Sequence, residues 1–123
     1  MKTDHFPDFL ESELGPEHKM GRGALFHVIP VPLEQTVSYG IGTALGPGAI
    51  LEASQQLECW DGFSEPLSVG IETKPFIDCS GDIVTILESI EEAVEEVVLH
   101  KNIPVVLGGE HTVSLAPIRV LAR

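Results

Sequence analysis

The segment from Ile83 to His100 predicts a long helix that is buried along one side. Its apolar residues recur at three- and four-residue spacing and form a single stripe, made of Ile83, Ile86, Leu87, Ile90, Val94, Val97 and Val98. Glutamates sit mainly off that stripe, and the pairs that lie one turn apart each cost roughly a few tenths of a kcal/mol by like-charge repulsion. Burial against the rest of the chain must therefore hold this helix.

Three short apolar segments are predicted to be strands because they are too short for helices and rich in β-branched residues. They are Ala24–Val31, Pro75–Cys79 and Ile103–Leu107. The first is expected to close at Pro30 and Pro32, since proline cannot donate to a ladder. A second helix, Pro47–Cys59, is expected between the first two strands, with proline at its first turn.

The alternation of strands and helices predicts an α/β fold with a mostly parallel sheet and crossover helices. Residues 1–22 are polar and interrupted by Pro and Gly, so we expect an extended lead-in there and a folded domain over residues 23–123. Ser80 or Asp82 can cap the long helix. The glycine loop at residues 40–46 matches neither a dinucleotide fingerprint nor a phosphate loop, and a tight turn before a helix is the better interpretation.

Composition excludes several classes of function. Asp and Glu number 19 against 7 Lys and Arg, and a net charge of −12 repels phosphate backbones, so nucleic-acid binding is not expected. No stretch is long enough to span a bilayer, and the acidic start is unlike a secretory signal. Two distant cysteines, Cys59 and Cys79, are typical of a reduced protein. We expect a cytoplasmic protein.

The stretch "VVLGGEHTVSL" is the candidate site, because ligands of open α/β sheets bind beyond the carboxyl ends of the strands. Gly108 and Gly109 allow a sharp turn, and Glu110 and His111 follow it. An imidazole there can bind a metal or move a proton. The alternative is a hydrogen-bonded turn without a ligand. The remaining histidines show no mutual ligand spacing and are expected to be structural or solvent-facing: His5, His18, His27 and His100.

These residues resemble a family. "VVLGGEHTVSL" looks like the first metal-ligand motif of the ureohydrolases (the arginase–agmatinase family), an apolar strand followed by Gly-Gly-[Asp/Glu]-His and Ser or Thr. "GIGTALGPGAILEASQQLECWD" resembles the early Gly-Thr-x-x-Gly-Pro segment of that family, and "PFIDCSGDI" resembles its strand ending in Asp-x-Gly-Asp. The likeness runs from about Ala24 to Arg123 and is closest to agmatinases.

The resemblance implies a three-layer α/β/α domain that is arginase-like, and two Mn²⁺ ions that share a bridging hydroxide. It implies hydrolysis of a small guanidino substrate, such as agmatine to putrescine and urea in polyamine biosynthesis. The motif's histidine is a direct metal ligand in the family, so that role falls to His111. Glu110 is expected to orient a ligand or loop by hydrogen bonding. Relatives assemble as trimers or hexamers, so a homo-oligomer is expected.

One departure is large. Residues 112–123 contain no Asp, Glu or His, whereas the family's other metal ligands come from motifs downstream of this point. We therefore expect the amino-terminal portion of a ureohydrolase, incomplete at the C-terminal side, with a free sheet edge and little activity by itself. Two alternatives are a non-catalytic interaction module that self-associates or pairs with a full-length relative, and a transition-metal site formed between chains by Glu110 and His111.

Overall fold

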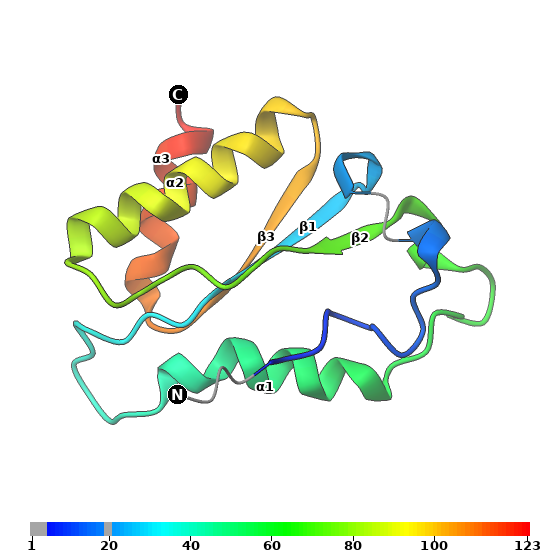
Figure 1. Ribbon diagram of the computed structural model, residues 1–123, viewed down its shortest axis with the longest axis horizontal. Helices are drawn as coiled ribbons and strands as arrows, with labels where there is room; N and C mark the ends of the chain where they lie inside the picture. Colours follow the sequence, from blue (N-terminus) through cyan, green and yellow to red (C-terminus); the bar gives the residue numbers. More distant parts are fainter. Residues whose placement is uncertain (1–4, 19–20) are drawn as a thin grey trace.

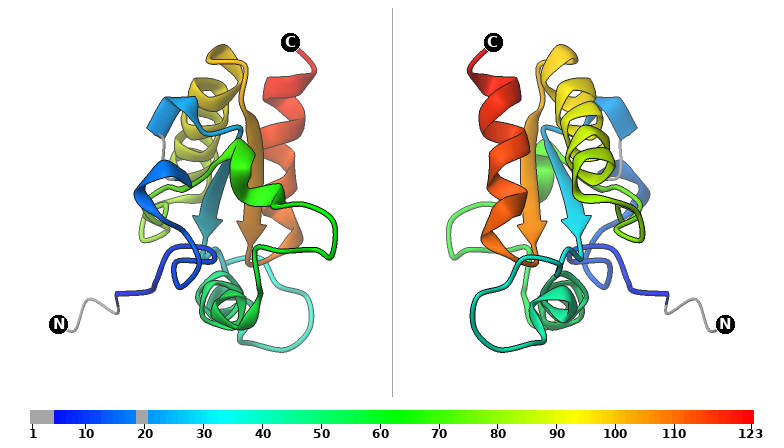
Figure 2. Two further views of the ribbon diagram at one scale, coloured as in Figure 1. Left: turned by 90° about the vertical axis from the view of Figure 1, so that its right-hand side faces the viewer. Right: turned by 90° about the vertical axis from the view of Figure 1, so that its left-hand side faces the viewer.

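The computed structural model describes residues 5–18 and 21–123, which form three layers around a parallel sheet (Figure 1). The strands are β1 (Phe26–Val31), β2 (Ile71–Thr73) and β3 (Ile103–Gly108), in the spatial order β2-β1-β3. The α-helices are α1 (Gly46–Ala53), α2 (Ile83–Leu99) and α3 (Leu115–Leu121). One helix, α1, covers one face, and α2 and α3 cover the other (Figure 2). This confirms the predicted α/β/α class.

Short 3₁₀ helices connect these elements or extend them. They are η1 (Pro16–His18), η2 (Gly21–Gly23), η3 (Thr43–Leu45), η4 (Ser54–Gln56), η5 (Pro66–Val69) and η6 (His111–Ser114). Among the described residues, no helix is both long enough and apolar enough to cross a membrane.

The core lies between β1 and the two helices α2 and α3. The predicted stripe of α2 is buried at Ile86, Leu87, Ile90, Val94 and Val97. It packs against the strand residues Ile29 and Val31 and against the α3 residues Ala116 and Val120. This burial explains how α2 tolerates its like-charged outer face. Its first turn is capped, as predicted, by the Asp82 carboxylate, which accepts from the Thr85 amide at 3.0 Å.

The first strand ends at Val31, immediately before Pro32, as its predicted range has it, but it begins at Phe26 rather than Ala24, and Pro30 lies inside it. Alternate residues of a strand face opposite neighbours, and the Phe26 amide donates toward β2, so the nitrogen of Pro30 also faces that side. There β2 has already ended at Thr73, and no ladder hydrogen bond is lost. The Pro30 carbonyl accepts instead from the Ile77 amide at 3.0 Å.

Two further expectations are corrected. The strand predicted at Pro75–Cys79 lies earlier, at Ile71–Thr73, and residues 75–79 only run alongside β1. The Lys74 amide donates to the Val28 carbonyl and the Ile77 amide to that of Pro30, so three residues of this segment span two of β1 and the regular ladder ends. The helix predicted to reach Cys59 ends at Ala53 and passes into η4. The Ser54 hydroxyl, which donates to the Leu51 carbonyl at 2.6 Å, turns back to the preceding turn at that point.

The described part of the lead-in lies against α1 and β2. The buried Leu10 donates its amide to the Ser54 hydroxyl at 2.9 Å, and Phe9 donates its amide to the Thr73 hydroxyl at 3.0 Å. The Phe6 ring stacks on Phe76 with centroids 5.3 Å apart. The domain boundary after residue 22 stays a prediction.

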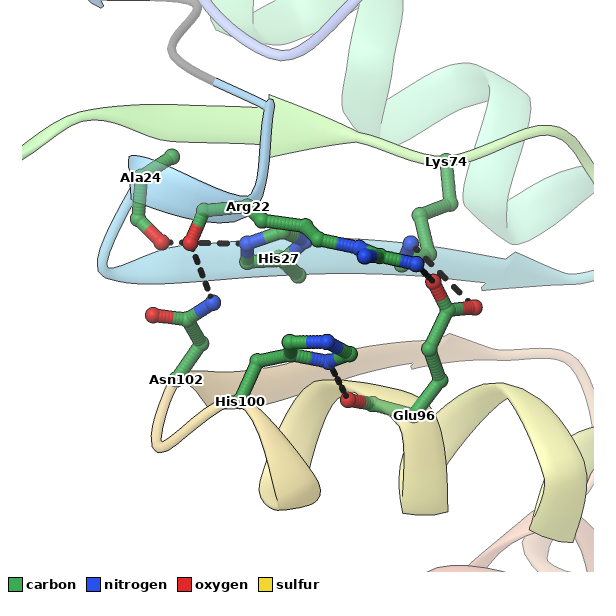
Figure 3. Close-up of polar contacts among 7 residues, drawn as sticks. All are labelled: Arg22, Ala24, His27, Lys74, Glu96, His100 and Asn102. Atoms are coloured by element: carbon green, nitrogen blue, oxygen red, sulfur yellow. Dashed lines mark hydrogen bonds and ion pairs between the residues drawn. The ribbon is translucent and has the colours of Figure 1, made fainter.

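A buried histidine lies on β1 at the amino end of the sheet (Figure 3). His27 is 2% exposed, and its Nε2 donates to the Ala24 carbonyl at 3.0 Å. Its Nδ1 has no hydrogen-bond partner among the described residues. Glu96 lies beside it and pairs with Arg22 and Lys74, each at 3.9 Å. Burial lowers the pKa of His27 below its ordinary value, and Lys74 adds to this effect, against the opposing hydrogen bond to Ala24 and the opposing charge of Glu96.

The core predicts a graded response to truncation on α2. Ile90→Val should lower the free energy of unfolding by about 0.5–1.5 kcal/mol, and Ile90→Ala by about 2–5 kcal/mol, because the residue is fully buried. Val84→Ala, on the exposed face of the same helix, should stay within about 0.5 kcal/mol. Urea denaturation followed by circular dichroism measures all three. Equal effects at positions 84 and 90 would contradict this packing.

His27 predicts that stability falls in mild acid. The unfolded chain binds a proton at this imidazole near pH 6.5, whereas the buried ring resists protonation. The free energy of unfolding should therefore fall as the pH drops below 6.5, until the folded protein also binds the proton. His27→Gln should remove this part of the pH dependence, and His100→Gln, at an exposed position, should leave it in place. Denaturation at pH values from 7.5 to about 5 makes the comparison.

Candidate functional site

The turn after β3 lies at the carboxyl edge of the sheet and is joined to the exit of β1. The Gly109 amide donates to the Val31 carbonyl at 3.2 Å, and the Glu110 amide donates to the Leu33 carbonyl at 2.9 Å. A Cβ atom on Gly109 would lie 2.2 Å from the Leu33 oxygen, so only glycine fits there. The close approach of the two segments therefore requires the second glycine of the Gly-Gly-Glu-His motif.

Glu110 is a buried carboxylate that holds the loop after β1. Its side chain accepts from the amides of Gln35 at 2.7 Å and Thr36 at 2.8 Å, and from the Thr36 hydroxyl. Burial by itself would raise the pKa of this group, but the hydrogen bonds from Thr36 and Gln35 outweigh it and lower the pKa. The residue is 6% exposed and charged at neutral pH. Glu110 thus orients a loop through hydrogen bonds.

His111 stands on the surface immediately after this buried anchor. It is exposed, begins η6, and has no side-chain hydrogen bond within the described residues. It borders an open depression of about 270 Å³. The other lining residues, many of them hydroxylic, are Thr36, Val37, Ser38, Tyr39, Thr43, Gly109, Glu110 and Thr112. The imidazole is therefore accessible at the sheet edge where the sequence predicted a ligand site.

The described residues do not by themselves fit a metal ion. No group of three or more His, Cys, Asp or Glu side chains in residues 5–18 and 21–123 is arranged to hold one. The remaining histidines have their contacts elsewhere. The imidazole of His18 accepts from the Gly15 amide, and the Nδ1 atom of His100 donates to the Glu96 carbonyl. The site thus contains one candidate ligand, His111.

Sequence reasoning missed Glu34, which supports the same loop from its other end. One carboxylate oxygen of Glu34 accepts from the Gly42 amide at 2.6 Å, the Thr43 hydroxyl at 2.9 Å and the Ala44 amide at 3.4 Å. These hydrogen bonds, led by the one from Thr43, lower the pKa of Glu34. A single acidic residue ahead of a glycine-rich turn is common, so the sequence carried no specific signal for this role.

Comparison with known proteins supplies the wider context. Residues 24–123 match the arginase family. The chain is 35% identical over 127 residues to N(1)-aminopropylagmatine ureohydrolase of Synechocystis sp., with 94% of this chain and 39% of that protein covered. It is 32% identical over 99 residues to an agmatinase of Bacillus cereus, with 76% of this chain and 33% of that protein covered.

Solved structures show the same fold. The agmatine ureohydrolase of Thermoplasma volcanium superposes with a TM-score of 0.78 at 23% identity, covering 95% of this chain and 39% of that chain. The formimidoylglutamase of Bacillus subtilis gives a TM-score of 0.72 at 20% identity, covering 99% of this chain and 39% of that chain. The chain thus spans about two fifths of the length of these relatives.

The Glu110 contacts predict a loss of stability when its charge is removed. Glu110→Gln should lower the free energy of unfolding by about 1.5–3 kcal/mol, because the carboxylate receives three hydrogen bonds in a buried position. Glu92→Gln, on the exposed face of α2, should have little effect. Chemical denaturation at pH 7 compares the variants. The difference between wild type and Glu110→Gln should shrink as the pH falls below 4.5, where the unfolded carboxylate takes up its proton.

Proposed function

The chain belongs to the arginase family, and we propose that it is the amino-terminal portion of a manganese-dependent ureohydrolase that acts on a small guanidino compound such as agmatine. The observation that carries this proposal is the Gly-Gly-Glu-His turn, which holds Glu110 buried and leaves His111 accessible at the carboxyl edge of the sheet. Relatives named as agmatinases and as an aminopropylagmatine ureohydrolase support the reaction class.

In this proposal His111 is one ligand of a metal pair. An imidazole among carboxylates suits Mn²⁺, and two divalent ions lower the pKa of bound water and clamp a transition state. The other ligands would come from the part of the family fold that this chain does not span. Glu110 supports His111 by fixing the turn on which it stands, because its own oxygens are engaged by the 35–36 backbone.

The charges of the residues that line the depression favour a cationic substrate. No lysine or arginine is among its lining residues, the Glu110 carboxylate is among them, and Glu34 binds the adjoining Gly42. A guanidinium group is attracted to such a surface, whereas a carboxylate on the substrate would be repelled. Agmatine, which ends in an amine chain rather than a carboxylate, therefore suits this part of the site better than an acidic analogue.

The exposed apolar surface at β3 and α3 agrees with a domain that continues. Among the described residues the outer edge of β3 has no strand partner, and Ile103 on β3 and Ile118 and Leu121 on α3 are exposed. We infer that the remaining part of a ureohydrolase fold covers this surface. The alternative, a non-catalytic interaction module, is not favoured, because named relatives are hydrolases. A homo-oligomer, trimeric or hexameric, and a cytoplasmic location remain part of the proposal.

The experiment reconstitutes the complete fold. Residues 1–123 are fused to, or mixed with, the remaining portion of a relative such as the Synechocystis enzyme, supplied with Mn²⁺, and assayed for urea released from agmatine and arginine. Urea should form from agmatine in preference to arginine. An assembly confirmed by light scattering that releases no urea from any guanidino substrate would argue against the proposal.

Within that assembly, His111→Ala should abolish urea release and weaken Mn²⁺ binding. Loss of a partner that merely orients a ligand costs about 10–100-fold in metal affinity, so loss of the ligand should cost at least as much. His100→Ala is the matched control, since His100 follows the last residue of α2 and its side chain donates to the Glu96 carbonyl. Calorimetric titration with Mn²⁺ measures both. Equal affinities in the two variants would remove His111 from the metal site.

A further inference from the structure

We propose that Glu34 is a positioning residue that holds one wall of the candidate site and thereby sets the affinity for substrate. This inference rests on the proposed function. The wall belongs to residues 35–42, called here the clamped loop, which connects the exit of β1 to η3 and α1. In Figure 1 this loop stands at the same end of the sheet as the turn that follows β3.

The clamped loop is held at both ends by carboxylates from outside it. At the outgoing end Glu110 binds the amides of Gln35 and Thr36, and the Thr36 hydroxyl lies 3.0 Å from that of Thr112. At the returning end one oxygen of Glu34 receives donors from three successive residues, numbers 42 to 44. The two ends are thereby drawn together.

Between these ends the loop has little support of its own. Tyr39 is 99% exposed and Ile41 is 94% exposed, and residues 37–41 make no side-chain hydrogen bond within the described part of the chain. The outgoing end has additional contacts, because the Gln35 side chain donates to the Gly81 carbonyl at 2.8 Å and the Thr36 hydroxyl lies against that of Thr112. At the returning end the Glu34 carboxylate accepts from residues 42–44, so its loss should loosen the wall at that end.

The wall and the accessible imidazole border the same depression. Thr36, Ser38 and Tyr39 of the loop line it together with His111 and Thr112. The Glu34 side chain makes its hydrogen bonds to residues 42–44 rather than to His111 or the turn that carries it. Its loss should therefore displace groups that would contact the substrate and leave the proposed metal ligand in place. Such a change weakens substrate binding without slowing the chemical step.

A substitution at Gly42 can disturb the hydrogen bond to Glu34 without changing the charge. Gly42, the first donor to Glu34, has a φ of 115°, which residues with a Cβ rarely adopt. A Cβ there would meet nothing within 4 Å, so Gly42→Ala introduces strain without a clash. Glu34→Asp keeps the negative charge but shortens the reach by one methylene. Together the two variants separate position from charge.

The first measurement uses the 123-residue chain alone. Amide hydrogen exchange at Gly42 and Ala44, read by NMR, should be at least about tenfold faster in Glu34→Gln than in wild type, because the acceptor charge is gone. Glu52→Gln, which removes an exposed charge on α1, is the matched control and should leave these rates unchanged. Equal exchange in wild type and Glu34→Gln would overturn the proposal.

The second measurement uses the reconstituted enzyme. Glu34→Gln, Glu34→Asp and Gly42→Ala should each raise KM for agmatine about tenfold, with kcat and Mn²⁺ affinity within about twofold of wild type. A wild-type KM in Glu34→Asp would show that charge acts rather than position, and a fall in kcat equal to the rise in KM would assign Glu34 to the chemical step; either overturns the proposal.

A wild-type assembly that releases no urea would overturn both the proposed function and the substrate role of Glu34. The exchange measurement needs no activity, so it distinguishes that outcome from a failure of the Glu34 contact itself. Faster exchange in Glu34→Gln with an unchanged KM would also overturn the proposal, since the wall would then move without affecting the substrate.

Discussion

The parallel pairing of β1 with β3 is the constraint on which the rest of this structure depends. It runs from Phe26 opposite Ile103 to Val31 opposite Gly108, and it requires a crossover long enough to return the chain to the same end of the sheet. The helix α2 provides that crossover and buries its apolar stripe against β1. Because both strands then end at the same edge, the chain leaving β1 and the turn after β3 meet there.

The meeting of these two segments explains where the carboxylates of Glu110 and Glu34 lie. Many of the acidic residues lie on solvent-facing surfaces, where they contribute net charge. Glu110 and Glu34 accept backbone amides at the two ends of the loop that follows β1. Each replaces hydrogen bonds that the loop backbone would otherwise make with water. The site therefore combines the turn after β3 with the loop after β1, whose two ends are bound by the carboxylates of Glu110 and Glu34.

The structure also shows why a family likeness leaves the activity of this chain as a proposal. Its residues span about two fifths of the relatives it matches, and His111 is the single candidate metal ligand that the described residues place at the sheet edge. A binuclear centre needs several ligands from different strands. Among the described residues the outer edge of β3 has no strand partner, and under the proposal further strands of the family fold would pair there.

Much of this architecture followed from local chemistry. The spacing in α2, the Asp82 cap and the short β-branched run of β3 depend on neighbours in the sequence, so they were predictable and were found as expected. The Gly-Gly-Glu-His turn was located because it follows a predicted strand and because its residues match the family motif. By contrast, β2 was misplaced, because the loss of register after Thr73 depends on the pairing with β1, which the local sequence does not show.

The sequence by itself therefore determined the α/β class, the approximate limits of α2 and β3, and the residues of the candidate turn. Only the tertiary structure decided that Glu110 is buried while its neighbour His111 is exposed, and that Glu34 holds the returning end of the loop. The reason is physical. Helix and strand preferences act over a few residues, whereas a carboxylate finds its donors through the meeting of segments far apart in the chain, here 74 and 75 residues for Glu110.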